Sequence, residues 1–328
     1  MIHTRKPRLS RRRQIQFMRQ SAAATTRKLR ANTAAPVVAL VFALAIACLH
    51  SNYANAATDQ PDTFPMAQDE GLQELLNKSL KDLNLTDILA KNKLSVTLVD
   101  ITDKDKPVIA NVNGANSYYA ASLPKLAILL AVYEEAHQGN LVLNDSVRQS
   151  LQNMIRKSSN RDATKLYELV GPARIAEILR SDRYRLYDEN TGGGLWVGKP
   201  YAKHNVWKRD PLSNLSHGAS GIQVARFYYM LERGELVHPQ YRDEIKSILA
   251  DSSINHKFVK GMKTHRPAAK IYRKSGTWRD YHSDSALIER ADGRKYIAVC
   301  LTQTPNGSSL LKKIIVNLDK VIDQHQPS

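Results

Sequence analysis

Cysteine is nearly absent from this sequence of 328 residues, which contains only Cys48 and Cys300. Cys48 lies in the N-terminal segment. Cys300 lies in the apolar, strand-like run YIAVCLTQ, where a buried and inert thiol is the usual state. We therefore expect no disulfide within the mature protein. The motifs C-x-x-C and H-E-x-x-H are also missing, so the sequence predicts no metal site and no cofactor.

Acidic residues are missing from the first 58 positions, because the first carboxylate of the chain is Asp59. Residues 1–30 hold ten Lys or Arg side chains and supply much of the net charge of +17. Without that segment, 38 basic residues face 31 acidic ones, a net charge of +7. A mildly basic domain lacks the charge concentration of a nucleic-acid-binding surface, so we expect no nucleic-acid partner.

The sequence also lacks an apolar run long enough for a membrane span, which needs about 20 residues. The longest apolar run in the sequence is AAPVVALVFALAIAC at 34–48. It follows the basic segment and precedes the small-residue pair Ala54 and Ala56. This is the layout of an export signal. We predict a signal peptide at 1–56, a linker at 57–69, and a periplasmic or secreted protein without stable membrane insertion.

Three features of this leader stay open. An uncleaved signal would anchor the protein to the membrane. A lipoprotein would need acylation at Cys48, and the preceding Ala45-Ile46-Ala47 matches that requirement poorly. Translation begins at either Met1 or Met18, and the sequence does not decide between them.

Hydrophobic periodicity in the remaining chain alternates between helical and strand-like segments. Apolar residues at three-to-four spacing predict helices, and β-branched runs predict a hairpin at 93–113 followed later by three further strands. The expected fold is an α/β (α+β) sandwich at 70–328: an antiparallel sheet of about five strands flanked by terminal helices, with a helical subdomain at about 116–250 inserted. The expected helices lie at 71–90, 123–139, 145–180 (broken at KSSN, 157–160, and at Gly171-Pro172), 222–234, 239–251 and 309–324; the later strands lie at 269–278, 284–291 and 295–304.

The segment YAASLPKLAILL, residues 119–130, combines a serine and a lysine with apolar surroundings. Ser122 and Lys125 are three positions apart, so they share one face of a helix. An unprotonated lysine can act as the base that a serine nucleophile needs, if burial lowers its pKa. The alternative is a serine that caps the helix and a lysine that extends to solvent.

Two later segments favour the catalytic interpretation. One contains Ser158-Ser159-Asn160, and the other is KSGT at 274–277, after an apolar strand-like run. Together with S-x-x-K, they resemble the S-x-x-K, S-D-N and K-T-G signature of class A β-lactamases and penicillin-binding proteins. Met154-Ile155 before S-x-N and Ala163 after it also fit this superfamily. The resemblance covers residues 70–325 approximately and implies the fold described above.

The resemblance implies a role for each matching residue in the first two motifs. Ser122 would attack a strained or terminal amide carbonyl, and Lys125 would take its proton. Ser158 would relay a proton to the leaving nitrogen. Asn160 would bind the side-chain amide of the substrate and help to hold Lys125. Ser158 and Asn160 have a structural alternative, the capping and ending of a helix.

The third motif would bind the other end of the substrate. By the same resemblance, Lys274 supplies positive charge and binds the substrate carboxylate, and Ser275 offers a hydroxyl to it. Gly276 lets the substrate pass close to the strand. The backbone N–H groups of Ser122 and Thr277 would form the oxyanion hole. The alternatives are an exposed strand lysine at 274 and a β-bulge at Gly276.

The sequence departs from the family pattern in several places. Ser159 replaces the usual acid, Ser275 replaces the usual threonine, and only 36 positions separate Ser122 from Ser158, which implies a shortened helical subdomain. No glutamate between residues 165 and 230 has an asparagine four positions later, the context of the deacylating base in class A enzymes. Asp188 and Glu189 are the nearest substitutes and could position a water, although a solvated loop carboxylate or a turn former is the favoured explanation of both.

The irregular segment 187–221 is long enough to suggest a functional loop. Trp196 and Tyr201 would line a pocket wall or pack within the loop, and His217 would reach the cleft or begin a helix. Without a placed base, deacylation should be slow, so acylation by β-lactams is better supported than rapid turnover.

Three functions remain open at this stage. The first is a class A β-lactamase-type serine hydrolase, a source of antibiotic resistance, that opens β-lactams. The second is a D-alanyl-D-alanine peptidase or cell-wall amidase. The third is a penicillin-binding sensor without turnover. The expected partner is a small β-lactam or peptidoglycan-derived molecule, and a monomer is expected. Serine-dependent glutaminases share similar motifs, but the export signal argues against them.

Overall fold

The computed structural model describes residues 68–326. The predicted signal peptide at 1–56, and all but the last two residues of the predicted linker at 57–69, lie outside the described residues. Between residues 68 and 326, no helix is both long enough and apolar enough to cross a membrane.

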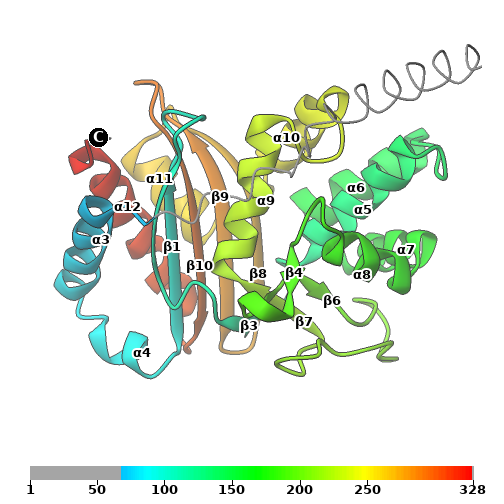
Figure 1. Cartoon of the computed structure of the whole chain (residues 1–328), viewed down its shortest axis with the longest axis horizontal. Helices are drawn as coiled ribbons and strands as arrows, with labels where there is room; N and C mark the ends of the chain where they lie inside the picture. The colour runs from blue at the N-terminus through cyan, green and yellow to red at the C-terminus, as the bar shows by residue number, and fades with distance from the viewer. Residues whose placement is uncertain (1–67, 327–328) are drawn as a thin grey trace, which may run out of the picture. The chain divides into compact units, whose positions relative to one another are not determined.

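A five-stranded sheet with the strand order β2-β1-β10-β9-β8 forms the centre of the described chain (Figure 1). All four strand pairs are antiparallel, and β1 pairs with β2 as the predicted hairpin. The α/β fold class and the sheet of five strands predicted from the sequence are therefore confirmed. The strands are β1 Leu94–Asp100, β2 Val108–Val112, β8 Lys270–Trp278, β9 Tyr281–Glu289 and β10 Lys295–Gln303.

Strand β10 is apolar on both sides because the sheet separates two hydrophobic cores. Side chains of a strand point alternately to opposite faces, so neighbours along β10 belong to different cores. Tyr296, Ala298 and Cys300 pack into one core. Ile297, Val299 and Leu301 pack into the other. Cys300 is fully buried and unpaired, as predicted.

Three helices cover the first face of the sheet: α3 Glu70–Asp82, α11 Lys257–His265 and the terminal α12 Gly307–Gln324 (Figure 1). The sequence prediction placed one helix over 71–90, but the left-handed backbone of Asn84 ends α3, and a separate short helix, α4 Thr86–Ala90, follows. Helix α11 was missed altogether, because the segment 252–268 carries only a short apolar pattern.

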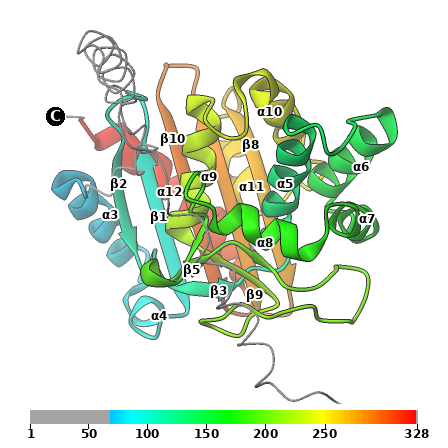
Figure 2. The same cartoon turned by 45° about the vertical axis from the view of Figure 1, so that its right-hand side comes forward.

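The second face is covered by α9 Gly221–Arg233, and further helices pack beyond it (Figure 2). Helix α5 is buried through nearly its whole first three turns, which explains why it is apolar all round rather than amphipathic. A buried helix cannot keep a lysine at its start without a specific set of partners. The other helices are α5 Lys125–His137, α6 Asp145–Arg156, α7 Asn160–Val170, α8 Pro172–Arg180 and α10 Arg242–Ala250.

The segment predicted to be irregular, 187–221, is more ordered than expected. Its strands β6 and β7 join β3 in a small sheet of order β3-β7-β6, and β4 pairs with β5. These pairs were missed because each strand is two to four residues long. The elements are β3 Ser117–Tyr119, β4 Tyr187–Asp188, β5 Gly193–Gly194, β6 Trp196–Val197 and β7 His217–Ser220; the 3₁₀ turns are η1 Glu189–Thr191 and η2 Pro239–Tyr241.

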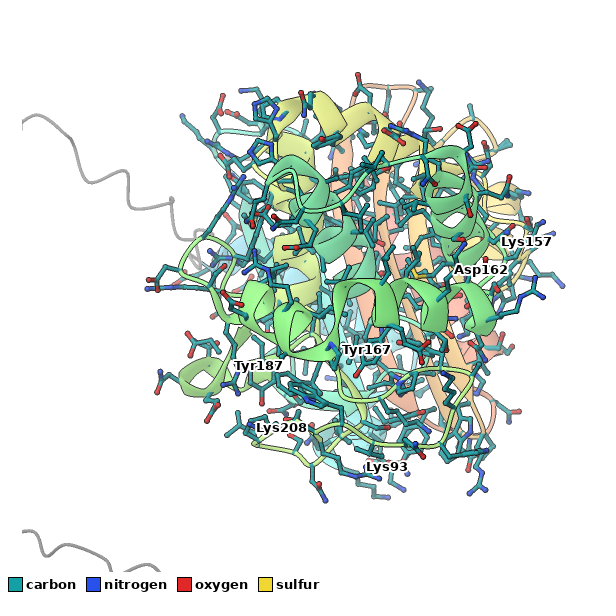
Figure 3. The ribbon with its side chains drawn as sticks, turned by 90° about the vertical axis from the view of Figure 1, so that its right-hand side faces the viewer. Lys93, Lys157, Asp162, Tyr167, Tyr187 and Lys208 are labelled. Carbon is teal, nitrogen blue, oxygen red and sulfur yellow. The ribbon has the colours of Figure 1, made fainter. Side chains whose placement is uncertain are left out.

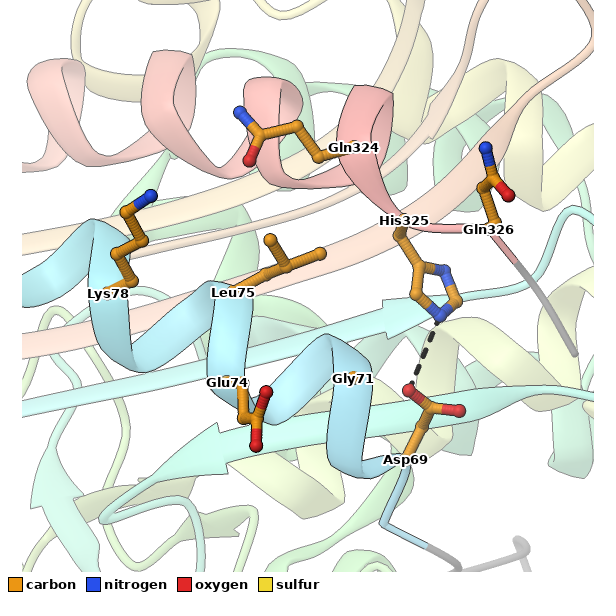
Figure 4. A pocket seen from close by; sticks show the side chains of 8 residues that line it. All are labelled: Asp69, Gly71, Glu74, Leu75, Lys78, Gln324, His325 and Gln326. Atoms are coloured by element: carbon orange, nitrogen blue, oxygen red, sulfur yellow. Dashed lines mark ion pairs between the residues drawn. The ribbon is translucent and has the colours of Figure 1, made fainter.

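A buried histidine connects the end of α12 to the start of α3. His325 Nδ1 lies 2.9 Å from Asp100 Oδ2, and its Nε2 lies 3.4 Å from Asp69 Oδ1 (Figure 4). Asp69 also caps α3 by accepting a hydrogen bond from Leu72 N–H. These contacts fasten both terminal helices to the edge of the sheet.

The loss of one partner from the buried ion pair between β8 and β9 is expected to destabilise the fold strongly. Arg273 donates two hydrogen bonds of 2.8 Å to Asp284, and both side chains are essentially inaccessible to solvent. Removing one partner leaves an uncompensated buried charge, so Asp284→Ala should lower the free energy of unfolding by about 3–5 kcal/mol. Glu189→Ala, which breaks the exposed pair with Arg180, is the matched control and should cost under about 1 kcal/mol in the same urea titration. Equal losses in the two variants would contradict this account.

Candidate active site

Ser122 lies in the turn that connects β3 to α5. Ala121 before it has the left-handed backbone conformation (φ 50°), and Pro124 caps the helix whose first residue is Lys125. A non-glycine residue in this conformation stores strain, and such strain is frequent at functional sites. Among the described residues, the N–H of Ser122 has no acceptor and its hydroxyl makes no hydrogen bond. Both groups are therefore available to a bound molecule.

Lys125 is fully buried and donates to three atoms of the chain. Its Nζ lies 2.6 Å from the Ser158 carbonyl oxygen, 2.8 Å from Asn160 Oδ1 and 3.4 Å from Ser158 Oγ. Burial lowers the pKa of Lys125 to about 7, against a smaller opposing effect of the Asp162 carboxylate. A large part of the Lys125 population is thus unprotonated near neutral pH, as a general base requires.

Ser158 and Asn160 come from the α6–α7 junction. Ser158 has a φ of 55°, which turns its carbonyl and hydroxyl oxygens toward Lys125. Ser159 caps α7, accepting from Asp162 N–H and donating to Asp162 Oδ2 at 2.5 Å. Lys157 and Asp162, which flank this junction in the sequence, are labelled in Figure 3. The capping alternative therefore applies to Ser159, while the side chains on either side of it reach Lys125.

Strand β8 places the third motif against the serine turn. A Cβ atom on Gly276 would lie 2.1 Å from the carbonyl oxygen of Ala120 and 2.7 Å from Ser122 N. The Ser283 hydroxyl, from neighbouring β9, donates to the same Ala120 oxygen at 2.8 Å. The strand and the turn thus pack backbone to backbone, and only glycine allows that approach. Thr277, the next residue along β8, is exposed.

Lys274 faces the same site from β8. It is buried, and its Nζ donates to Ser158 Oγ at 3.1 Å and to the Ser275 carbonyl at 2.7 Å. Burial lowers its pKa well below the ordinary value, and the positive charges of Lys125 and Arg273 add to the effect. The Ser158 hydroxyl therefore lies within hydrogen-bond reach of both lysines. The alternative of an exposed strand lysine does not apply.

The close approach at Gly276 gives a direct prediction. In Gly276→Ala the new methyl group overlaps backbone atoms that cannot rotate away, so β8 or the serine turn must shift, at a cost of about 1–3 kcal/mol. Calorimetry should show a lower Tm. Gly71→Ala in the first turn of α3 is the control, because its Cβ would meet only Asp69 Oδ1 at 3.4 Å. An unchanged Tm for Gly276→Ala would refute the described packing.

A third buried lysine, Lys257 at the start of α11, was missed in the sequence. Its Nζ donates to the carbonyl oxygens of Gly276 (2.6 Å) and Ser283 (3.1 Å) and to Thr277 Oγ1 (2.8 Å). Burial lowers its pKa to about 8. It fixes the Gly276–Thr277 peptide from behind. No local pattern marks it, since lysines on amphipathic helices are exposed by default.

His256, which precedes Lys257, also reaches the strand. Its Nε2 lies 3.5 Å from Ser275 Oγ. Burial, with the nearby charges of Arg273 and Lys257, lowers its pKa to about 4, so the ring is neutral at pH 7. The Ser275 hydroxyl is thereby held at the site beside Lys274.

Tyr201 lies against both Lys125 and the serine turn. Its ring lies 4.6 Å from Lys125 Nζ, and its hydroxyl donates to the Ala121 carbonyl at 3.1 Å. His217 packs on the other side of the ring at 4.2 Å, and burial lowers the pKa of His217 to about 3. Trp196, by contrast, is buried in the core against Tyr187. Of the two predicted wall residues, the structure places only Tyr201 beside Lys125.

Asp188 and Glu189, the predicted candidates for a deacylating base, make their contacts elsewhere in the described chain, and that role stays a prediction. Glu189 pairs with Arg180 at 2.7 Å, and Asp188 caps the η1 turn through Asn190 N–H. Both carboxylates line a pocket with Arg180 and Arg185. Neither contacts Ser122 or Lys125 within the described part of the chain.

The assembled groups are a free hydroxyl, a lysine with a lowered pKa, a second hydroxyl between two buried lysines, and an amide. This set fits covalent acyl transfer by a serine nucleophile. In residues 68–326, no cluster of three His, Cys, Asp or Glu side chains has the arrangement of a metal site.

Comparison with known proteins gives one family. The model of the β-lactamase enzyme family matches residues 76–150 and 143–326. No curated protein sequence matches the chain.

Solved structures share its fold at low sequence identity. PBP-A superposes with a TM-score of 0.62 and 17% identity over 79% of this chain and 99% of PBP-A. A PBP-A variant, solved as an acyl-enzyme with penicillin G, superposes with a TM-score of 0.62 and 17% identity over 79% of this chain and 100% of the variant. A representative of class A β-lactamases from Bacteroides cellulosilyticus superposes with a TM-score of 0.59 and 18% identity over 77% of this chain and 98% of that protein. At these identities, the comparisons establish the fold.

Proposed function

The chain belongs to the β-lactamase enzyme family, and on this basis we propose that it is an exported serine hydrolase that β-lactams acylate on Ser122. The observation that carries the proposal is Lys125, a buried lysine with a lowered pKa, three residues after an unpaired serine hydroxyl. The penicillin G acyl-enzyme of the PBP-A variant, which shares this fold, supports the choice of β-lactams. Action on cell-wall-derived amides would require a periplasmic or secreted location.

Acylation begins when Ser122 Oγ attacks the lactam carbonyl and its proton passes to Lys125 Nζ. The carbonyl oxygen becomes negative, and the N–H groups of Ser122 and Thr277 would stabilise it. The C–N bond then breaks. The Ser158 hydroxyl, 3.4 Å from Lys125 Nζ, would deliver a proton to the leaving nitrogen and recover one from the lysine. The products are a Ser122 ester and a free amine within the opened ring.

The substrate carboxylate would bind Lys274 and Ser275. A carboxylate beside Lys274 favours the protonated lysine and offsets its burial. That leaves Lys125 as the neutral member of the two lysines. Substrate binding would therefore help to distribute the charge that catalysis needs.

Hydrolysis of the ester would be slow in this site. The side chain beside Lys125 is Tyr201. Burial raises the pKa of Tyr201 well above its ordinary value, so the phenol keeps its proton and cannot act as a base. Asp162, the carboxylate that acts on Lys125, is engaged with Ser159. With no free carboxylate in contact with Lys125 in the described residues, a long-lived acyl-enzyme is expected.

The same observation favours a second candidate, a D-alanyl-D-alanine peptidase, cell-wall amidase or acylated sensor rather than an efficient β-lactamase. Two readouts separate these functions: moles of β-lactam hydrolysed per mole of protein, and D-alanine released from peptides that end in D-alanyl-D-alanine. We expect roughly stoichiometric consumption of benzylpenicillin over minutes. D-Alanine release would identify a peptidase, and its absence would identify a sensor. Many rapid turnovers would identify a β-lactamase and overturn slow deacylation.

A further inference from the structure

An aromatic cluster lies at the end of β8, directly after the Lys-Ser-Gly-Thr motif. Trp278 lies 5.3 Å from Tyr119 and 6.0 Å from Tyr281, between ring centres, and Tyr119 lies 5.2 Å from Tyr281. Trp278 is nevertheless 46% exposed. The guanidinium of Arg279 lies over its ring at 4.5 Å. The Trp278 side chain is thus partly open to solvent beside the site, with the Arg279 guanidinium over its ring.

This cluster is in contact with the aromatic rings beside Lys125. Tyr201 contacts Lys125, His217 packs against Tyr201, and Tyr119 lies 6.1 Å from His217, edge to face. Tyr119 then touches Trp278 and Tyr281. A contiguous series of rings therefore connects the buried lysine with the exposed indole, and it brings together β3, β7, β8 and the loop that carries Tyr201.

The order of residues along β8 indicates which part of a substrate meets the indole. Under the proposed function, Lys274 and Ser275 bind the carboxylate on the leaving side, and Gly276 lies at Ser122, where the carbonyl reacts. Trp278 lies two residues beyond Gly276, about 7 Å further along the strand. An extended substrate would place its acyl side chain there.

We propose that Trp278, with Tyr119 and Tyr281, forms a subsite for a flat apolar ring on the acyl side of the substrate. This proposal rests on the proposed function. A cross-strand Trp–Tyr pair also stabilises a hairpin, but that role is best served by burial, whereas this indole is nearly half exposed. Aromatic contacts contribute about 0.5–1.5 kcal/mol beyond the area they bury, enough for measurable selectivity.

Two β-lactams with the same nucleus test the subsite. Benzylpenicillin carries a phenyl ring on its acyl side, and 6-aminopenicillanic acid carries none. In Trp278→Ala, the second-order acylation constant for benzylpenicillin should fall roughly 3- to 10-fold. The second-order acylation constant for 6-aminopenicillanic acid should stay within about twofold of the wild-type value. Trp278→Phe, which keeps a ring, should retain most of the preference.

Trp207→Ala is the matched control, because Trp207 is 42% exposed but packs on Trp196 instead of the cluster. It should leave both constants unchanged. An equal loss for both compounds in Trp278→Ala, or no loss for either, would overturn the subsite while leaving the proposed function intact. If the wild-type protein reacts with neither compound, the proposed function fails, and the subsite fails with it.

Discussion

Ser122→Ala should reduce acylation by β-lactams more than about 1,000-fold, to below detection. The acyl bond is made to the Ser122 oxygen, so its removal leaves no nucleophile at the point where β8 and the serine turn meet. Labelling with a fluorescent penicillin, followed by denaturing electrophoresis, measures the effect directly. The fold should survive, because the hydroxyl makes no hydrogen bond within the described residues.

Ser309→Ala provides the control for this variant, since Ser309 is exposed on α12. It should label like the wild type. Undiminished labelling of Ser122→Ala would show that another residue carries the acyl group, and the assignment of the nucleophile would be wrong.

The acylation rate should rise with pH and level off near pH 7, because only the neutral form of Lys125 accepts a proton. Its pKa is lowered to about 7, so the neutral fraction increases roughly tenfold per pH unit below that value and approaches one above it. In Lys125→Met, which has a side chain of similar length and no amine, acylation should fall about 100- to 10,000-fold. Stopped-flow kinetics between pH 5.5 and 8.5 measures both effects.

Lys260→Met, a change at an exposed lysine on α11, should keep the wild-type profile. A profile that continues to rise up to pH 10 would mean that Lys125 is an ordinary protonated lysine. A residual flat rate in Lys125→Met, equal to the wild-type plateau, would assign the base to another group.

The parts of the fold predicted correctly are those with a strong local pattern. Strands β1, β9 and β10 alternate between two cores or are buried throughout, and α12 carries a regular apolar face. The parts missed have weak patterns. Helix α11 spans nine residues, and the short strands β3 to β7 contain too few side chains for periodicity.

The site residues, like the fold elements, were predicted where the sequence carries a recognisable local pattern. Ser122, Lys125, Ser158, Asn160 and Lys274 were predicted from motifs. The structure joins the last four by hydrogen bonds and packs Gly276 of the third motif against the Ser122 turn. Whether they perform the predicted roles is the subject of the experiments above.

Residues whose position depends on the path of a loop were harder to predict. Asp188 and Glu189 were chosen for their chemistry, but in the structure they contact Asn190 and Arg180. Lys257 reaches the site only because α11 packs behind β8, a tertiary contact with no local signature. The position of Tyr201 beside Lys125 likewise follows from the loop, not from its neighbours in the sequence.

The most direct test of the whole account is the intact mass of the protein from Ala57 onward, followed from seconds to hours after addition of benzylpenicillin. The account predicts one added penicilloyl group, formed within minutes and still present after hours. An adduct that appears and vanishes as the drug is consumed would contradict slow deacylation. The absence of any adduct at all times would contradict the central claim that Ser122 and Lys125 form an acylating pair.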